Sequence, residues 1–193
     1  MAYNFDKITA VIAEDNPHMR YLIKGILQAF GCKSIKEASN GQEAMQIINS
    51  SSADILICDW NMEPVNGIEL VKAVRNTESS PNPFMPIIML TGYSQHKRVI
   101  EARDAGVDEF VAKPISAKIL YEHLKSVIEH PRSYVRSPTY FGPDRRRRQI
   151  PFNGEDRRKN TPDVEDAPRR KKDLSESDIM ALLQTEEGEG ESK

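Results

Sequence analysis

The clearest indication of the fold of this chain is the run Ile55-Leu56-Ile57-Cys58-Asp59-Trp60-Asn61-Met62. Its first four residues are all apolar and predict a strand that is buried on both faces. The strand ends at Asp59, a carboxylate that a polar turn follows. Such continuous apolar strands are typical of parallel sheets, whose ligands bind in the crevice beyond the carboxyl ends of the strands. The stretch therefore places a negative charge where a parallel α/β fold binds its ligands.

The 193 residues carry a formal net charge of -2, which is unevenly distributed along the chain. Residues 1–131 are close to neutral, residues 132–172 are strongly basic and residues 173–193 are strongly acidic. The balanced total gives no general indication of binding to nucleic acid or to a membrane. No apolar run is long enough for a membrane span, the N-terminus does not resemble a signal peptide, and the two cysteines lack the spacing of a metal site or disulfide framework. We therefore expect a cytoplasmic protein.

Strand-like and helix-like patterns alternate strictly over the first 131 residues. Short apolar, β-branched runs predict strands, and apolar residues at helical spacing follow each of them. The predicted strands cover residues 8–13, 34–38, 55–59, 86–90 and 109–112, and the last two helices cover 94–105, with Ser94 as the N-cap, and 116–129. Five such units in alternation imply an α/β fold with a doubly wound, five-stranded parallel sheet and helices on both faces. Residues 1–131 are therefore predicted to form one domain.

The chain changes character after Pro131. Residues 132–172 contain proline, arginine and aspartate but few periodic apolar residues, which predicts a disordered basic linker. Residues 173–193 form an acidic tail in which helical spacing returns. A short amphipathic helix is predicted there, with a narrow apolar face made of Leu174, Ile179, Leu182 and Leu183.

Charged and hydroxyl side chains follow four of the five predicted strands: Glu14 and Asp15, Asp59, Thr91, and Lys113. Carboxylates that are packed together repel one another, and Mg²⁺, which prefers oxygen ligands, would relieve this repulsion. A carboxylate nucleophile with Mg²⁺, a hydroxyl and a lysine suits phosphoryl transfer. Each residue alone is more often a helix cap, a turn residue or a surface lysine. Their joint occurrence at successive strand ends favours a site.

The set Glu14-Asp15, Asp59, Thr91 and Lys113-Pro114 resembles the receiver domain of bacterial two-component response regulators. The run from Asp59 to Met62 is similar to that of the CheY family of single-domain chemotaxis regulators, and the resemblance spans about residues 6–129. It implies that Asp59 accepts a phosphoryl group from a histidine kinase or a phosphotransfer protein. The chain would then be a phosphorelay switch with intrinsic acceptor and autodephosphorylation chemistry, and not otherwise an enzyme.

The resemblance also implies roles for the neighbouring residues. The carboxylates of Glu14, Asp15 and Asp59 and the backbone carbonyl of Asn61 would hold Mg²⁺. Lys113 and Thr91 would bind the phosphoryl oxygens, and Thr91 would move inward while the aromatic residue Phe110 rotates in. Phe110 stands where CheY has a tyrosine, so a hydroxyl-dependent contact with a partner would be lost.

The run from Leu174 to Leu183 resembles the N-terminal peptide of the flagellar switch protein FliM, which in its family binds phosphorylated CheY. A helix in a groove is a common mode of recognition. The resemblance implies a flagellar-switch-like or other protein target in chemotaxis or motility, and it allows the tail to dock on its own receiver. The alternative is an accidental match, or a helix for a different partner.

Two other functions stay open from the sequence. Arg145 to Arg148, with Tyr140 and Phe141 nearby, would suit a nucleic-acid-associated regulator that contacts phosphates. Interspersed acidic residues and the absence of a predicted scaffold for these arginines argue against it. A receiver without any target would instead act as a phosphate sink.

Overall fold

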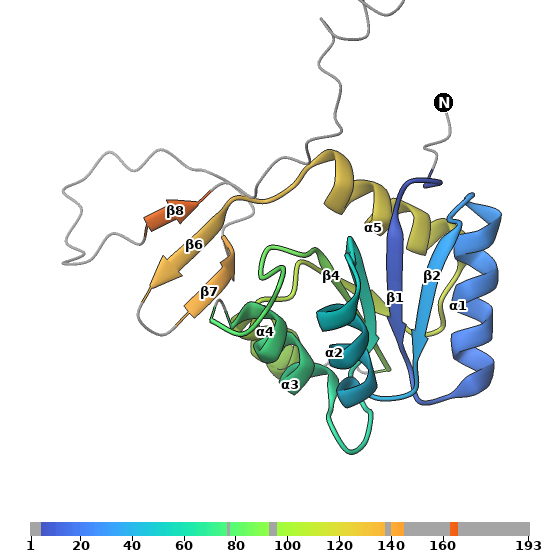
Figure 1. The fold of residues 1–193 in the computed structure, drawn as a ribbon, viewed down its shortest axis with the longest axis horizontal. Coiled ribbons are helices and arrows are strands. Elements are labelled where there is room, and N and C mark those ends of the chain that lie inside the picture. Colours follow the sequence, from blue (N-terminus) through green and yellow to red (C-terminus); the bar gives the residue numbers. More distant parts are fainter. Residues whose placement is uncertain (1–4, 77, 93–95, 138–139, 145–162, 166–193) are drawn as a thin grey trace, which may run out of the picture.

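A computed structural model describes residues 5–76, 78–92, 96–137, 140–144 and 163–165 of the chain. Its main body is a five-stranded parallel sheet with the strand order β2-β1-β3-β4-β5 (Figure 1). The strands are β1 (Thr9–Ala13), β2 (Ser34–Ala38), β3 (Ile55–Asp59), β4 (Ile87–Thr91) and β5 (Glu109–Ala112). The helices are α1 (Pro17–Ala29), α2 (Gly41–Ser50), α3 (Gly67–Arg75), α4 (His96–Ala105) and α5 (Ala117–Glu129). The predicted doubly wound fold is confirmed.

The sheet separates two hydrophobic cores. Leu56 and Cys58 of β3 belong to the core beneath α2, α3 and α4, whereas Ile55 and Ile57 belong to the core beneath α1 and α5. Successive side chains of a strand point to opposite faces, so a strand covered on both sides must be apolar at every position. All five residues of β3 and of β4 are buried. β3 is therefore the middle strand of the sheet and is buried on both faces, as predicted.

Side-chain caps mark the starts of α1, α2, α3 and α5. Asn16, Asn40, Asn66 and Ser116 each accept hydrogen bonds from the first turn of the helix that follows, which satisfies N–H groups that have no partner within the helix. Ser94, the predicted cap of α4, lies outside the described residues. None of the helices in the described ranges is both long enough and apolar enough to cross a membrane.

Residues beyond α5 form a second sheet, which is antiparallel and has the order β7-β6-β8 (Figure 1). Its strands are β6 (Tyr134–Ser137), β7 (Tyr140–Pro143) and β8 (Asp163–Glu165). The predicted disordered linker over 132–172 is wrong at these residues. The strands are only three or four residues long, which is too short for a periodic pattern of apolar residues in the sequence. Tyr134 is buried against the receiver, and a single buried residue leaves no such pattern either. The predicted tail helix from Leu174 lies outside the described residues.

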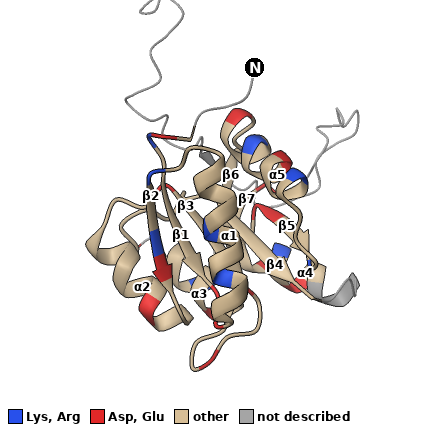
Figure 2. Cartoon of the chain, turned by 90° about the vertical axis from the view of Figure 1, so that its right-hand side faces the viewer, with Lys and Arg blue, Asp and Glu red and all other residues tan. Residues whose placement is uncertain are grey.

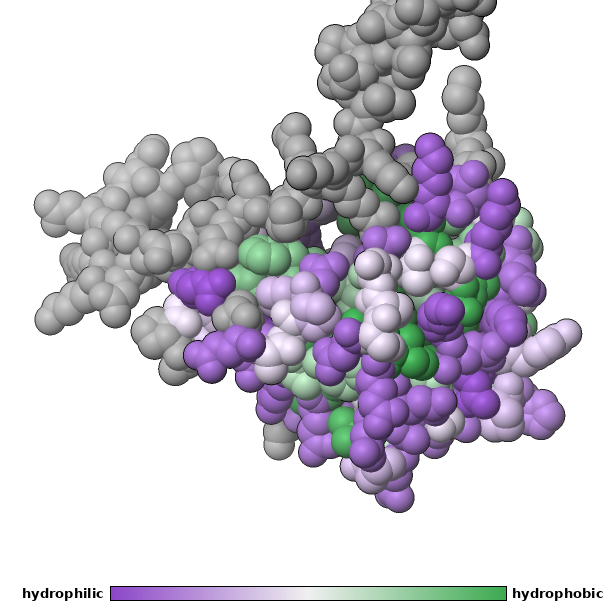
Figure 3. Space-filling model, in the orientation of Figure 1, coloured by the Kyte–Doolittle hydropathy of each residue, from purple (hydrophilic) through white to green (hydrophobic). Residues whose placement is uncertain are grey.

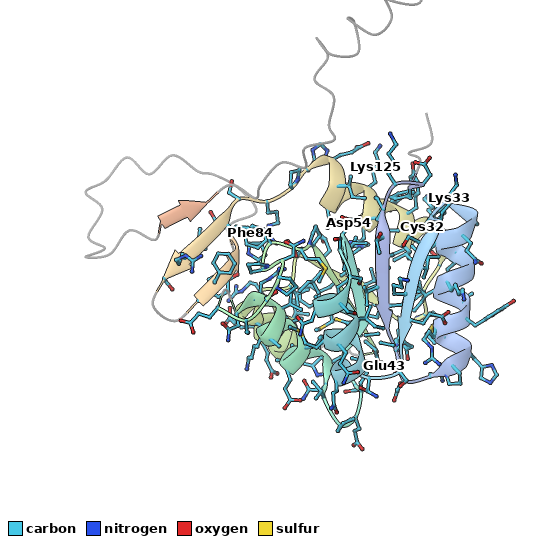
Figure 4. All side chains as sticks on the ribbon, viewed as in Figure 1. Cys32, Lys33, Glu43, Asp54, Phe84 and Lys125 are labelled. Atoms are coloured by element: carbon cyan, nitrogen blue, oxygen red, sulfur yellow. The ribbon has the colours of Figure 1, made fainter. Side chains whose placement is uncertain are left out.

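We call the antiparallel pair of strands β6 and β7 the hairpin. It packs beside the amino ends of β4 and β5, next to Phe84 (Figure 4). Asp59 ends β3, so the hairpin and the predicted site lie at opposite edges of the parallel sheet. The surface of the body on the side shown in Figure 3 is mainly hydrophilic.

Candidate functional site

Three carboxylates meet at the carboxyl edge of the sheet. Glu14 and Asp15 follow β1, and Asp59 ends the neighbouring strand β3, where Ala13 pairs with Cys58. One oxygen from each of the three carboxylates lies within 4.8 Å of the other two. Glu14 and Asp59 are buried, whereas Asp15 is exposed. The parallel register of β1 and β3 thus brings together residues that are 44 or more positions apart in the chain.

Lys113 joins two of these carboxylates. It follows β5, and its Nζ lies 2.9 Å from Glu14 Oε2 and 2.9 Å from Asp59 Oδ1. Its backbone N–H donates to the carbonyl of Thr91, at 2.8 Å, which ties the end of β5 to the end of β4. The structure therefore places Lys113 and Thr91 at the same edge as the carboxylates.

The electrostatics of the site follow from burial and from Lys113. Burial raises the pKa of Glu14, and the negative charge of Asp59 raises it as well, although the hydrogen bond from Lys113 opposes both effects. Burial would lower the pKa of Lys113, but hydrogen bonds to Asp59 and Glu14 outweigh it, so the pKa of Lys113 is raised. Lys113 thus pairs with two of the three clustered carboxylates, Glu14 and Asp59.

This donor set fits a hard divalent cation. Three carboxylates with clustered oxygens offer the ligands that Mg²⁺ prefers, and partial exposure through Asp15 leaves access for the waters that Mg²⁺ retains. Asn61, whose carbonyl is the other predicted ligand, lies two residues after Asp59 and is exposed. Its role stays a prediction.

The two predicted switch residues lie on neighbouring strands. Thr91 is the last residue of β4 and is 4% exposed. Phe110 lies in β5 opposite Met89 and is half-buried against the core beneath α2, α3 and α4. Phe110 therefore lies two residues away from Thr91 in the register of β4 and β5, and a coupled movement of the two side chains stays a prediction from the sequence resemblance.

Two residues that hold the site in shape were missed from the sequence. Arg20 of α1 donates from Nη1 to the backbone carbonyl of Glu14, at 2.6 Å. Gly67 donates its N–H to the Trp60 carbonyl, at 2.9 Å, and thereby joins the two ends of the loop between β3 and α3. A glycine directly after Asn66, the N-cap of α3, was the only available signal, because both contacts depend on tertiary structure.

Substitution of Gly67 by alanine is expected to destabilise this loop. The added Cβ would clash with the carbonyl oxygen of Asp59, so the backbone of one segment must shift. We expect a loss of about 1–3 kcal/mol in the free energy of unfolding, as for other overpacked sites. Urea unfolding measures it, with Gly25→Ala as the matched control because a Cβ at Gly25 meets nothing within 4 Å. Equal stabilities of the two variants would contradict the prediction.

Comparison with known proteins defines the class to which this fold and site belong. Residues 10–125 match the model of the response regulator receiver domain, and the chain belongs to this family. The chain is similar to the chemotaxis protein CheY of Pseudomonas aeruginosa, with 35% identity over 119 residues, which cover 62% of this chain and 94% of the relative. It is also 32% identical to CheY-3 of Vibrio cholerae, over 62% of this chain and 90% of that protein.

Solved structures show the same fold. The chemotaxis protein CheY4 of Vibrio cholerae superposes with a TM-score of 0.57 and 30% identity, over 63% of this chain and 99% of that one. A putative response regulator from Chloroflexus aurantiacus superposes with a TM-score of 0.59 and 28% identity, over 64% of this chain and 98% of that one. The family match ends at residue 125, so the hairpin lies outside it.

Proposed function

We propose that the protein is a phosphorylation-dependent response regulator of a two-component system, with Asp59 as the phosphoryl acceptor. The observation that carries this proposal is the position of Lys113, whose Nζ lies 2.9 Å from both Asp59 and Glu14. This cation can pass from the carboxylate to the oxygens of a phosphoryl group without leaving the site. The phosphoryl donor is a histidine kinase or a phosphotransfer protein.

The chemistry is a simple displacement at phosphorus. A carboxylate oxygen of Asp59 attacks, the bond between phosphorus and the donor's histidine nitrogen breaks, and the proton taken up by that nitrogen comes from water. Lys113 and the Thr91 hydroxyl stabilise the negative charge on the phosphoryl oxygens. Mg²⁺, bound by Glu14, Asp15, Asp59 and the Asn61 carbonyl, would neutralise charge on the carboxylates and on the phosphoryl group. Hydrolysis of the acyl phosphate returns the protein to its starting state without any other substrate.

Protein contacts carry the output in this proposal. The relatives named above are chemotaxis proteins, which supports a role in chemotaxis or motility signalling in the cytoplasm. The target is a flagellar-switch-like or other protein, and the acidic tail docks on the phosphorylated receiver of its own chain in competition with that target. Basic and acidic residues are interspersed on the side of the body shown in Figure 2, which gives no support to nucleic-acid binding by the receiver.

Phosphoryl transfer from a small donor tests the proposal directly. The full chain is incubated with acetyl phosphate and Mg²⁺, and the intact mass is followed with time. We expect the mass of one phosphoryl group to be gained, and peptide mapping to locate it at Asp59. Excess EDTA is expected to suppress the gain. A chain that gains no mass, or that carries the group on a different residue, would overturn the assignment.

Removal of residues 173–193 tests the proposed docking of the tail. The shortened chain retains every described residue, so its free energy of unfolding should be unchanged. If the tail occupies the phosphorylated receiver, its loss should change the lifetime of the phosphorylated protein by at least about twofold, since a tethered ligand acts at high effective concentration. The decay of the phosphorylated mass measures this lifetime. Identical decay in the two chains would rule out docking of the tail.

A further inference from the structure

A buried ion pair lies beneath the hairpin. Arg75, at the end of α3, contacts Asp108 with an Nη2–Oδ2 distance of 2.7 Å, and both side chains are almost fully buried. Arg75 also donates to the carbonyls of Gly106, at 2.9 Å, and of Pro83 and Met85, each at 2.7 Å. This cluster joins the end of α3, the start of β4 and the end of α4.

The hairpin completes this cluster with a tyrosine. Tyr134 is 2% exposed, and its hydroxyl lies 3.2 Å from Asp108 Oδ1 and 3.1 Å from the carbonyl of Phe84. The ring of Phe84 contacts those of Tyr134 and Phe141, each with a centroid distance of 5.1 Å. Edge-to-face and tilted ring pairs at this distance are attractive. The hairpin therefore occupies a specific docking site on the receiver.

Two glycines allow β7 of the hairpin to approach the end of α4 closely. A Cβ added to Gly142 of β7 would lie 3.0 Å from Gly106 Cα, just after the last residue of α4. A Cβ added to Gly106 would lie 3.3 Å from the carbonyl oxygen of Phe141. The two backbones thus pack directly against each other. A small shift of the end of α4 would break this packing, because close-packed interfaces do not deform continuously.

Helix α4 is held to the body mainly by small side chains. Of its residues whose side chains are described, Ala102 and Ala105 are buried, whereas Val99 and Ile100 are 37% and 36% exposed. Alanines bury little apolar area, so this helix gains less from the core than α1, which buries Ile23 and Leu27. Contact with β7 therefore contributes a larger share of what keeps α4 in place.

We propose that docking of the hairpin and phosphorylation of Asp59 are coupled through α4, and that the hairpin docks more tightly on the unphosphorylated receiver. This inference rests on the proposed function. A phosphoryl group adds about 1.5 to 2 negative charges and three acceptor oxygens at the carboxyl edge. These attract the hydroxyl of Thr91, which lies five residues before the start of α4. A movement of Thr91 shifts α4 as a rigid body. Gly106, which follows the far end of this helix, then no longer packs against Gly142.

Hydrogen exchange on the full chain measures this coupling from the hairpin side. Beryllofluoride with Mg²⁺ serves as the phosphoryl mimic, and the fluorescence of Trp60, the single tryptophan of the chain, reports its binding next to Asp59. We expect amides of residues 134–137 and 140–142 to exchange about fivefold faster with the mimic bound, in line with typical coupling between sites. In the Asp59→Asn chain, beryllofluoride is expected to change neither the fluorescence of Trp60 nor the hydrogen exchange of the hairpin.

The reciprocal measurement weakens docking and follows binding of the mimic. Gly142→Val should undock β7 from Gly106, and the ring of Tyr140 in the same strand must also shift, because the added Cβ would lie 2.7 Å from its hydroxyl oxygen. Phe141→Ala, which removes the ring beside Phe84, is the second variant. Both should lower the half-saturating beryllofluoride concentration about fivefold, since linkage is reciprocal. Gly25→Val, at an exposed position where a Cβ meets nothing within 4 Å, should leave the half-saturating beryllofluoride concentration unchanged.

The outcomes separate the two proposals. A fluorescence response to the mimic, with unchanged hairpin exchange and unchanged affinity in both hairpin variants, would overturn the coupling and leave the proposed function standing. No response of Trp60, together with no phosphoryl gain from acetyl phosphate, would overturn the proposed function and the coupling with it. Slower exchange of the hairpin with the mimic bound would overturn the proposed direction.

Discussion

Replacement of Asp59 by asparagine is expected to abolish phosphoryl acceptance and to raise the free energy of unfolding in metal-free buffer. The amide cannot attack phosphorus at a useful rate, so the loss of acceptance should be complete. The second effect follows from the charges at the site, where Lys113 pairs with Glu14 and Asp59, and oxygens of Glu14, Asp59 and Asp15 all lie within 4.8 Å of one another. Removal of one carboxylate relieves repulsion with Glu14 and leaves Lys113 paired with Glu14. We expect a gain of about 1 kcal/mol.

Asp54→Asn is the matched control for this variant. Asp54 immediately precedes the same strand but lies at its amino end, where Oδ2 accepts the N–H of Thr9 at 2.8 Å (Figure 4). The Asp54→Asn chain should accept the phosphoryl group like the wild type, and its free energy of unfolding should not rise. Intact-mass labelling and urea unfolding are run on all three chains. Phosphoryl gain by Asp59→Asn at the wild-type rate would contradict the proposed acceptor, and a loss of stability would contradict the account of charge repulsion.

Replacement of Arg75 by methionine is expected to have the largest effect on stability. Methionine has a similar length and no charge, so the buried carboxylate of Asp108 and three carbonyls lose their donor. Breaking a buried ion pair from one side costs about 3–5 kcal/mol, because an uncompensated charge stays buried. Burial already raises the pKa of Asp108, although Arg75 opposes this effect, so loss of Arg75 should raise that pKa further. The loss is a large fraction of the about 5–15 kcal/mol typical of a domain.

Arg103→Met supplies the control for this prediction. Arg103 lies near the end of α4 and pairs with Asp104 at 2.9 Å, but both side chains are more than 40% exposed. An exposed pair contributes about 0–1 kcal/mol, so this variant should unfold close to the wild type. The double variant Arg75→Met with Asp108→Asn should recover part of the loss, since no unpaired charge remains. Similar urea midpoints for Arg75→Met and Arg103→Met would show that the buried pair does not hold this edge together.

The parallel fold was predictable because its signals are local. The four consecutive apolar residues from Ile55 to Cys58 predict a strand with a layer of helices on each face, and β3 is buried along its whole length. Residues after neighbouring strand ends had to share one edge of the sheet, so the convergence of Glu14, Asp59 and Lys113 followed from the order of the strands. The distances between these side chains could not be predicted from the order of the strands. That Lys113 bridges two carboxylates depends on the bend of the chain after β5, which no local pattern encodes.

We could predict from the sequence the class of fold, the edge at which the charged residues meet and the resemblance to receiver domains. We could not predict that the chain continues as a hairpin after α5, or that Arg75, Asp108 and Tyr134 form one buried cluster beneath it, because these features depend on tertiary contacts. The physical reason is the range of the interactions. A strand buried between two layers of helices must be apolar along its length, whereas a four-residue strand that is stabilised by one tyrosine, one glycine and a distant ion pair has no periodic sequence pattern of its own.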